Sequence, residues 1–241
     1  STQSNVMSNT DDFKFSNIST IASDSSTNLL FVLDTVMTTI YIYDTTGYLN
    51  DDDIYIKRVP AGRILVDQIG GVEDTILDDP KSIAVEDGKL YVFESGSETK
   101  SCTVKIFNTS TLALVDTIAL DDTVNDSMVS GFAGINMLYS IIKLSTSNSY
   151  KINTYNLTTG ETSNFTTPYI RGEIPLQFQI GISNPNIAYL LTTKNIYKFH
   201  ITKLYIPTGK FDFSSVPKSS LDGDDIFNCF YIKEYYGGPD T

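Results

Sequence analysis

One pattern of short apolar runs and turn residues recurs four times along this chain of 241 residues. The clearest copy has an apolar run at 83–85, an Asp-Gly pair, a second apolar run at 90–93 and, after a polar gap, a third run at 104–107. Comparable runs occur at 29–33 with 40–43, at 137–142 with 150–155, and at 187–191 with 196–199. Because each copy holds several short runs bounded by turn residues, each predicts a small antiparallel sheet.

The spacing of the copies predicts the architecture. Phe31, Tyr91, Tyr139 and Tyr189 each stand in the second run of their copy, and the gaps between them are 60, 48 and 50 positions. Blades of a β-propeller typically span about 40–50 residues, and an insertion at 48–79 accounts for the long first gap. No window shows a sustained helical period. We therefore predict an all-β fold, a β-propeller with four or more antiparallel blades.

The repeat also predicts the domain boundaries. Residues 1–12 are polar and patternless, and we expect them to form a disordered or linking arm. The predicted propeller covers 13–241, with blades at 13–79, 80–128, 129–175 and 176–218 and a partial blade at 219–241. Because the last copy is cut short and the sequence begins at Ser1, we expect a segment of a longer protein.

Two local features support this prediction. Asp87-Gly88 between two apolar runs predicts a type I′ hairpin turn, whose twist matches that of the flanking strands. Turns that begin with Asp44, Asn108 and Asn156 end the third run of the first three copies. Small residues are expected where the innermost strands crowd together, and the sequence offers four candidates for such positions: Ala22, Ala84, Ala133 and Gly181.

Charge and composition exclude several classes of function. The net charge of −12 and the pI near 4.4 disfavour nucleic-acid binding and docking on anionic lipid. No apolar run approaches the length of a membrane span, so we expect no membrane insertion. The absence of Trp disfavours a standard WD40 protein. Cys102 and Cys229 lack metal-binding spacing and predict free, half-buried thiols.

A family resemblance rests on two stretches of the second copy, 80–92 and 104–108, with the Ser95-Gly96-Ser97 loop between them. This arrangement resembles an NHL or YVTN-type propeller repeat. A narrower stretch, 41–52 followed by Gly70-Gly71 and Asp79-Pro80, is similar to NHL-repeat structural proteins in the virions of tailed phages, notably cyanobacterial ones. The resemblance implies a propeller and a structural role in a virion, while the third and fourth copies depart from it by lacking the Asp-Gly turn.

Catalytic residue types are sparse. His200 is the only histidine, and no nucleophile motif accompanies it, so an ordinary histidine at a strand end is the expected reading. Glu94, Glu98 and Glu161 are expected on loops, without the spacing of a glycosidase pair. We therefore predict that the protein is not an enzyme and that it has no catalytic or cofactor-binding residues.

Acidic turns and tyrosines supply the remaining candidates. Asp222, Asp224 and Asp225 are candidate calcium ligands, although this cluster departs from the EF-hand pattern and a solvated turn is the expected alternative. Asp51-Asp52-Asp53 has the same two interpretations. Four tyrosines are candidates for partner binding through loops, with a place in the core or at a strand edge as the alternative: Tyr48, Tyr169, Tyr235 and Tyr236.

Three functional hypotheses follow from these features. The first is a non-enzymatic structural or interaction module in a virion tail or capsid-associated assembly, which presents loops to partner subunits or to a host surface receptor. The second is a cell-surface or periplasmic YVTN-like binding protein, which would place the chain outside the cell. The third is a hydrolase or lyase propeller with a metal in a central channel.

Overall fold

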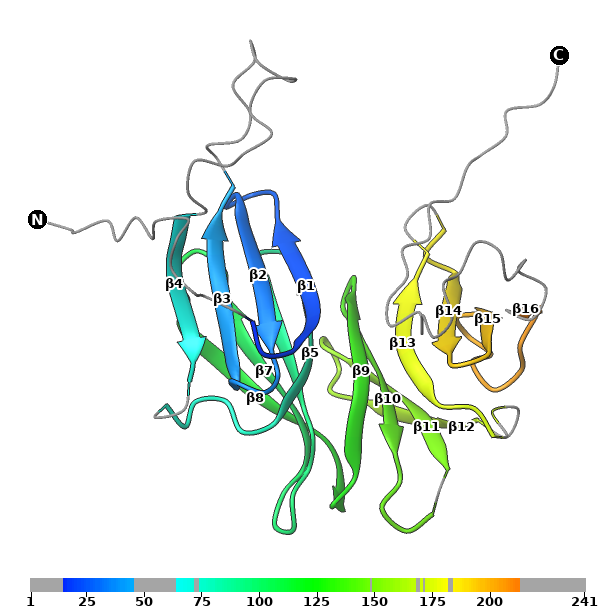
Figure 1. Ribbon diagram of the computed structural model, residues 1–241. Helices are drawn as coiled ribbons and strands as arrows, with labels where there is room; N and C mark the ends of the chain where they lie inside the picture. The colour runs from blue at the N-terminus through cyan, green and yellow to red at the C-terminus, as the bar shows by residue number, and fades with distance from the viewer. Residues whose placement is uncertain are drawn as a thin grey trace, which may run out of the picture. The chain divides into compact units, whose positions relative to one another are not determined.

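The structure is a computed structural model that describes residues 15–45, 64–71, 74–147, 149–167, 170, 172–181 and 184–212. Within these residues the chain forms four sheets of four strands, and each sheet keeps its strands in chain order (Figure 1). The first sheet contains β1 (Ile18–Asp24), β2 (Leu29–Asp34), β3 (Thr39–Asp44) and β4 (Ile64–Gly70). The second contains β5 (Pro80–Glu86), β6 (Lys89–Glu94), β7 (Ser101–Asn108) and β8 (Leu114–Val124).

The third sheet contains β9 (Ser127–Gly134), β10 (Met137–Lys143), β11 (Tyr150–Asn156) and β12 (Thr162–Thr166). The fourth contains β13 (Pro175–Ile180), β14 (Ile187–Thr192), β15 (Asn195–His200) and β16 (Gly209–Asp212). All four sheets are therefore antiparallel meanders, and the prediction of an all-β fold built from repeated small sheets is confirmed.

Strand register tests the predicted alignment of the repeats. Ala22 lies opposite Phe31 and Ala84 lies opposite Tyr91, so these two small residues occupy equivalent positions. In the third and fourth sheets the positions opposite the aromatic residues are held by larger side chains, Phe132 opposite Tyr139 and Gln179 opposite Tyr189. The expectation that Ala133 and Gly181 hold the equivalent position is wrong: Ala133 lies opposite Leu138, one position nearer the hairpin turn, and Gly181 follows the end of β13.

The predicted turn chemistry is confirmed where the structure describes it. Asp87 and Gly88 both have positive φ, 49° and 68°, as a type I′ turn requires. The side-chain oxygen of Asn108 accepts hydrogen bonds from the backbone N–H groups of Ser110 and Thr111. The side-chain oxygen of Asn156 accepts the same pair of bonds from the residues two and three positions onward. These asparagines therefore end the third strand by closing a turn on themselves.

A second hydrogen bond recurs at this end of every sheet. The first residue after the third strand donates its N–H to a carbonyl in the turn between the first two strands. The four bonds are Thr45 to Asn28 at 2.8 Å, Thr109 to Gly88 at 3.0 Å, Leu157 to Asn136 at 2.9 Å and Ile201 to Asn186 at 2.8 Å. Because this bond is made in all four sheets, the sequence repeat is also a repeat of three-dimensional structure. We call this end of each sheet the turn end.

The contacts of the chain divide it into two compact units, Ser1–Ser95 with Thr103–Ala119, and Gly96–Cys102 with Leu120–Thr241. In the first unit, β1 lies beside β5, and the N–H of Ile83 donates to the hydroxyl of Thr20 at 2.9 Å. The apolar core of this unit lies between its two sheets. It contains Phe31, Leu33, Ile40 and Ile42 from the first sheet and Ile83, Leu90, Val92 and Phe107 from the second.

The second unit repeats this arrangement by itself. Strand β9 lies beside β13, and the N–H of Phe178 donates to the hydroxyl of Ser130 at 3.4 Å. Its core joins Tyr139, Ile141 and Ile152 of the third sheet to Phe178, Leu190 and Phe199 of the fourth. In each unit the first sheet contributes the face that carries the aromatic of its second strand, and the second sheet contributes the other face. Stacking sheets in this way requires strands that are apolar on both sides.

Candidate functional site: the clasp end of each sheet

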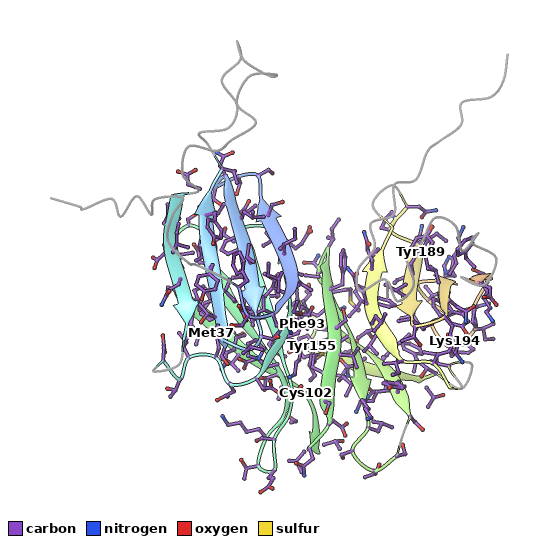
Figure 2. All side chains as sticks on the ribbon, in the orientation of Figure 1. Met37, Phe93, Cys102, Tyr155, Tyr189 and Lys194 are labelled. Carbon is purple, nitrogen blue, oxygen red and sulfur yellow. The ribbon has the colours of Figure 1, made fainter. Side chains whose placement is uncertain are left out.

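Opposite the turn end, each sheet has an end at which the second strand finishes and the first strand begins. At this end a buried polar side chain links the segment that leads into the first strand to the end of the second strand or to the turn that follows it. We call this arrangement the clasp and this end of the sheet the clasp end. The turn between the second and third strands also lies here, as Met37 and Lys194 illustrate for the first and fourth sheets (Figure 2).

In the first sheet the clasp is Asp34, the last residue of β2. Its carboxylate is completely buried and accepts the N–H groups of Ser16 at 2.6 Å and Asn17 at 3.1 Å. It also accepts the N–H groups of Val36 and Met37, both at 3.1 Å. One carboxylate therefore holds both the entry to β1 and the turn after β2. Burial, followed by the charge of Asp34, raises the pKa of the neighbouring Tyr41.

In the second sheet the clasp is Glu94, the last residue of β6. Its side chain is 1% exposed and accepts the N–H of Asp78 at 2.9 Å. The Nζ of Lys105 lies 2.9 Å from the other carboxylate oxygen and donates to the carbonyl of Ile76 at 2.6 Å. The expectation that Glu94 lies on a loop is therefore wrong. The residue ends a buried strand, and its charge is compensated by Lys105 on β7, two positions after Thr103, which pairs with Glu94.

In the third sheet the clasp is Asp126, which precedes β9. Its carboxylate accepts the N–H of Ser145 at 2.8 Å and lies 3.2 Å from the Nζ of Lys151. Its backbone carbonyl accepts the N–H of Gly96 at 2.9 Å and the thiol of Cys102 at 3.2 Å. A Cβ on Gly96 would lie 3.0 Å from this carbonyl and 2.7 Å from the carbonyl of Lys100, so the close approach requires glycine.

In the fourth sheet the clasp is the pair Thr192 and Glu173. The hydroxyl of Thr192 donates to the carboxylate of Glu173 and accepts the N–H of Asn195 at 2.9 Å. The hydroxyl of Tyr197 donates to the same carboxylate at 2.7 Å. Burial disfavours the charged carboxylate, but the hydrogen bonds from Asn195, Thr192 and Tyr197 outweigh it and lower the pKa of Glu173. Burial and the bond to Glu173 raise the pKa of Tyr197.

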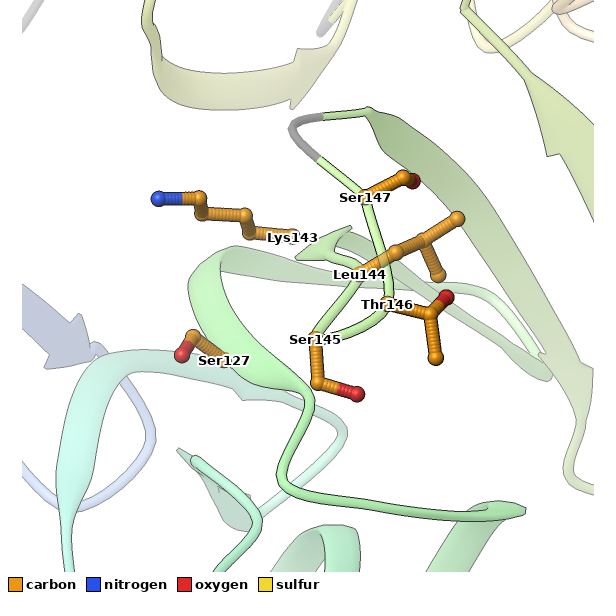
Figure 3. Close-up of a pocket in the computed structure, with 6 residues that line it drawn as sticks. All are labelled: Ser127, Lys143, Leu144, Ser145, Thr146 and Ser147. Atoms are coloured by element: carbon orange, nitrogen blue, oxygen red, sulfur yellow. The ribbon is translucent and has the colours of Figure 1, made fainter.

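A pocket of about 360 Å³ lies at the clasp end of the third sheet (Figure 3). It is lined by Ser127, Lys143, Leu144, Ser145, Thr146 and Ser147. Lys143 and Ser127 project to one side of the turn, whereas Thr146 and Ser147 project to the other side (Figure 3). The side chains therefore do not converge on a common point, as the groups of a catalytic or ligand-binding site would.

The single histidine has a structural role at the turn end of the fourth sheet. His200 ends β15 and is exposed, and its Nδ1 lies 2.8 Å from the hydroxyl of Thr202. The N–H of Thr202 points to the same nitrogen at 3.4 Å. His200 thus occupies the position that Asn108 and Asn156 hold in the second and third sheets, and its ring nitrogen replaces their side-chain oxygen. The interpretation of an ordinary histidine at a strand end agrees with this geometry.

The other candidate residues fall into two groups. Cys102 is a free thiol and is completely buried, not half-buried as expected (Figure 2). The remaining candidates lie outside the described residues: Tyr48, Tyr169, Tyr235 and Tyr236, the acidic residues Asp51, Asp52, Asp53, Asp222, Asp224 and Asp225, and Cys229. The predicted arm at 1–12 and the partial blade at 219–241 also lie outside them.

The described part of the chain contains no group of three or more His, Cys, Asp or Glu side chains placed to hold a metal ion. No helix in it has the length and apolar character that a membrane crossing requires. The clasps are not evident from the sequence. In the sequence, each clasp residue is a polar residue at the end of the second apolar run or just before the first. Taken alone, such a residue cannot be told apart from an ordinary turn residue.

Comparison with known proteins identifies the fold. No family model matches the chain, and no curated protein matches it. Among solved structures, the Dos1 propeller is similar with a TM-score of 0.53 and 14% identity, over 81% of this chain and 47% of that one. Hydrazine synthase of Kuenenia stuttgartiensis is similar with a TM-score of 0.53 and 11% identity, over 75% of this chain and 50% of that one.

The β-propeller domain of Cps50 (Swd1) from Myceliophteria thermophila is also similar, with a TM-score of 0.51 and 8% identity. That match covers 84% of this chain and 57% of the Cps50 domain. The chain thus spans about half the length of these structures. At such low identity the likeness concerns the fold alone. Together with the four meander sheets, it identifies the chain as an all-β protein with the architecture of an incomplete β-propeller.

Proposed function

We propose that the protein is a non-enzymatic interaction module whose clasp ends hold loops in place for partner subunits. The observation that carries this proposal is the recurrence of the clasp in all four sheets. The carboxylates of Asp34, Glu94 and Asp126 each accept a backbone N–H of a connecting segment. The carboxylate of Glu173 accepts the hydroxyl of Thr192 at the end of β14. Loops held in this way lose little conformational entropy when a partner binds, which favours affinity.

Exposed aliphatic side chains at the clasp ends supply contact area for a partner. Val36, in the turn between β2 and β3, is 65% exposed, and Ile174, just before β13, is 56% exposed. Both stand within two residues of a clasp residue, Asp34 and Glu173 respectively. Apolar side chains at the centre of a contact, surrounded by polar ones, provide much of the binding energy of protein interfaces.

We further propose that the assembly is a virion, with the protein as a tail or capsid-associated subunit. This finer proposal rests on the resemblance of 41–52, Gly70-Gly71 and Asp79-Pro80 to NHL-repeat structural proteins of tailed phages. A repeated, acidic and rigid fold is compatible with presenting loops to neighbouring subunits or to a host surface receptor.

The proposal is tested in purified particles of the phage whose genome encodes the chain. Mass spectrometry is expected to find the protein at a constant copy number, and cross-linking is expected to join a clasp-end turn to another virion protein. A double variant, Val36→Ser with Ile174→Ser, is expected to reduce incorporation strongly. Ile135→Ser is the matched control, because Ile135 is 78% exposed at the turn end of the third sheet. Absence of the protein from washed particles would refute the virion role.

A further inference from the structure

In each unit the two packed sheets are joined by the same hydrogen bond between their first strands. Thr20 on β1 and Ser130 on β9 each stand two positions before the residue that lies opposite the aromatic of the second strand. Their hydroxyls accept the N–H groups of Ile83 and Phe178, which belong to the first strand of the following sheet. A polar side chain at this position therefore receives the next sheet, and we call it the acceptor position.

The fourth sheet has an acceptor position on a face that no described sheet follows. Gln177 on β13 stands two positions before Gln179, which lies opposite Tyr189. We call this side of the sheet the Tyr189 face. The row that crosses it from the acceptor position consists of three apolar residues: Leu191, Ile196 and Phe211. The same row of the third sheet packs in the core that the third sheet shares with the fourth: Ile141, Ile152 and Phe165. The Tyr189 face thus resembles a face on which another sheet packs.

A buried hydrogen-bond acceptor on the Tyr189 face lacks a donor. Gln179 is 7% exposed, and its side-chain oxygen Oε1 is buried without a hydrogen-bond partner. Buried polar atoms are paired in most proteins, because an unpaired one loses its bonds to water without replacement. This oxygen therefore indicates that a further segment brings donor groups to the inner strand of the sheet.

The chain itself supplies an apolar run at the spacing of the repeat. Residues 213–241 follow β16, and the run Ile-Phe-Asn-Cys-Phe-Tyr-Ile occupies 226–232. Asn228 is the only amide residue of this run and has an apolar neighbour on each side, as Gln177 has in β13. The acceptor positions of the four sheets, at 20, 82, 130 and 177, are 62, 48 and 47 positions apart, and Asn228 follows after 51. The run therefore falls where the first strand of a following sheet is expected.

We propose that residues 226–232 dock on the Tyr189 face as a strand beside β13, with Cys229 directed at the sheet. Cys229 takes the place that Ile83 and Phe178 hold in the two units, where each packs in the core facing the preceding sheet. Its N–H donates to the side chain of Gln177, as the repeat of the bond between first strands requires.

The connection to the sheet favours this segment over other occupants. Residues 213–241 are joined directly to β16 of the same sheet, so their effective concentration at the Tyr189 face is far above that of a second copy or of another protein. The inference concerns a sheet face and does not depend on the proposed function of the clasp ends.

The native cysteine of the run makes the contact measurable. In a Cys102→Ser background Cys229 is the only cysteine left. There, Gln177→Cys is expected to form an intramolecular disulfide with Cys229 in most molecules after treatment with glutathione disulfide, because a disulfide requires Cα atoms about 4.4–6.8 Å apart. Ser163→Cys is the matched control, since Ser163 is exposed on β12 of the third sheet, and it is expected to stay mostly unlinked. Mass spectrometry of non-reduced digests measures both.

Alkylation of Cys229 provides a second measurement that leaves Gln177 unchanged. In Cys102→Ser, iodoacetamide is expected to label Cys229 about tenfold more slowly than it labels the same residue in a synthetic peptide of residues 222–236. Labelling of a packed thiol requires local opening of the structure, whereas the thiol of the peptide is always accessible.

Three results overturn the proposal: no more intramolecular disulfide in Gln177→Cys than in Ser163→Cys, a disulfide that joins only two separate copies, or equal alkylation rates in the protein and the peptide. The second result would assign the Tyr189 face to another copy of the chain. If circular dichroism shows that Gln177→Cys does not fold, the alkylation rate alone decides. Val36→Ser with Ile174→Ser is expected to leave both measurements unchanged, so failure of the clasp-end proposal and failure of this one remain distinguishable.

Discussion

The clasp of the second sheet provides the sharpest test of how this fold is held together. Glu94 is 1% exposed and the side chain of Lys105 is 12% exposed, with 2.9 Å between the charged atoms. Removal of one partner from such a pair leaves a buried charge uncompensated, which typically costs about 3–5 kcal/mol. Lys105 retains the carbonyl of Ile76 and the carboxylate of Asp78 at 3.6 Å, so we expect Glu94→Ala to cost about 3 kcal/mol, the lower end of that range.

The cost is measured as the free energy of unfolding in urea, for Glu94→Ala, Lys105→Met and the double variant. Because the double variant leaves no unpaired charge, its loss is expected to be clearly smaller than the sum of the two single losses. Lys81 and Asp79 give a matched control, since they lie 2.6 Å apart but are 36% and 51% exposed. Lys81→Gln is expected to cost at most about 1 kcal/mol. Additive losses, or a Glu94→Ala loss no larger than that of Lys81→Gln, would refute the reasoning.

Three further predictions concern single positions. Gly96→Ala is expected to lower the midpoint of thermal unfolding markedly, because the new Cβ would meet two backbone carbonyls. Gly134→Ala is expected to change the midpoint little, because the nearest atom to its Cβ is a side-chain atom at 3.6 Å. Equal midpoints for the two variants would contradict this reasoning. In urea unfolding, His200→Ala is expected to lower the free energy of unfolding by about 1 kcal/mol, and His200→Asn is expected to leave it almost unchanged, because Asn restores the side-chain acceptor of the turn. Equal losses for the two variants would exclude a role of His200 as this acceptor. The pKa of Tyr197 is raised above its ordinary value of 10.0, so the contribution of Tyr197 to stability is complete below that pH and is lost as the pH rises through the folded-state pKa. In Glu173→Gln, phenolate absorbance is expected to show the titration of Tyr197 at lower pH. An unchanged titration would contradict the hydrogen bond between the two side chains.

The clasps explain why the candidate site was harder to predict than the fold. The end of a strand is visible in the sequence, but the partner of a buried polar side chain is not. Glu94 belongs with Asp78 and Lys105, which stand 16 and 11 positions away and meet only when β5, β6 and β7 have paired. Asp126 belongs with Lys151 in the same way, across β9, β10 and β11. The acidic residues therefore resembled solvated turn residues until the strands were placed.

Local chemistry determined what the sequence alone could predict. Apolar runs, an Asp-Gly pair with positive φ and turn-closing asparagines act over a few neighbouring residues, and they specified four repeated small sheets with their hairpins. Ala133 and Gly181 stand one and two positions from the residues opposite the aromatics, because register depends on how whole strands pair and not on a local run of residues. The clasps likewise exist only in three dimensions, because the burial of their carboxylates arises from contacts between residues distant in sequence.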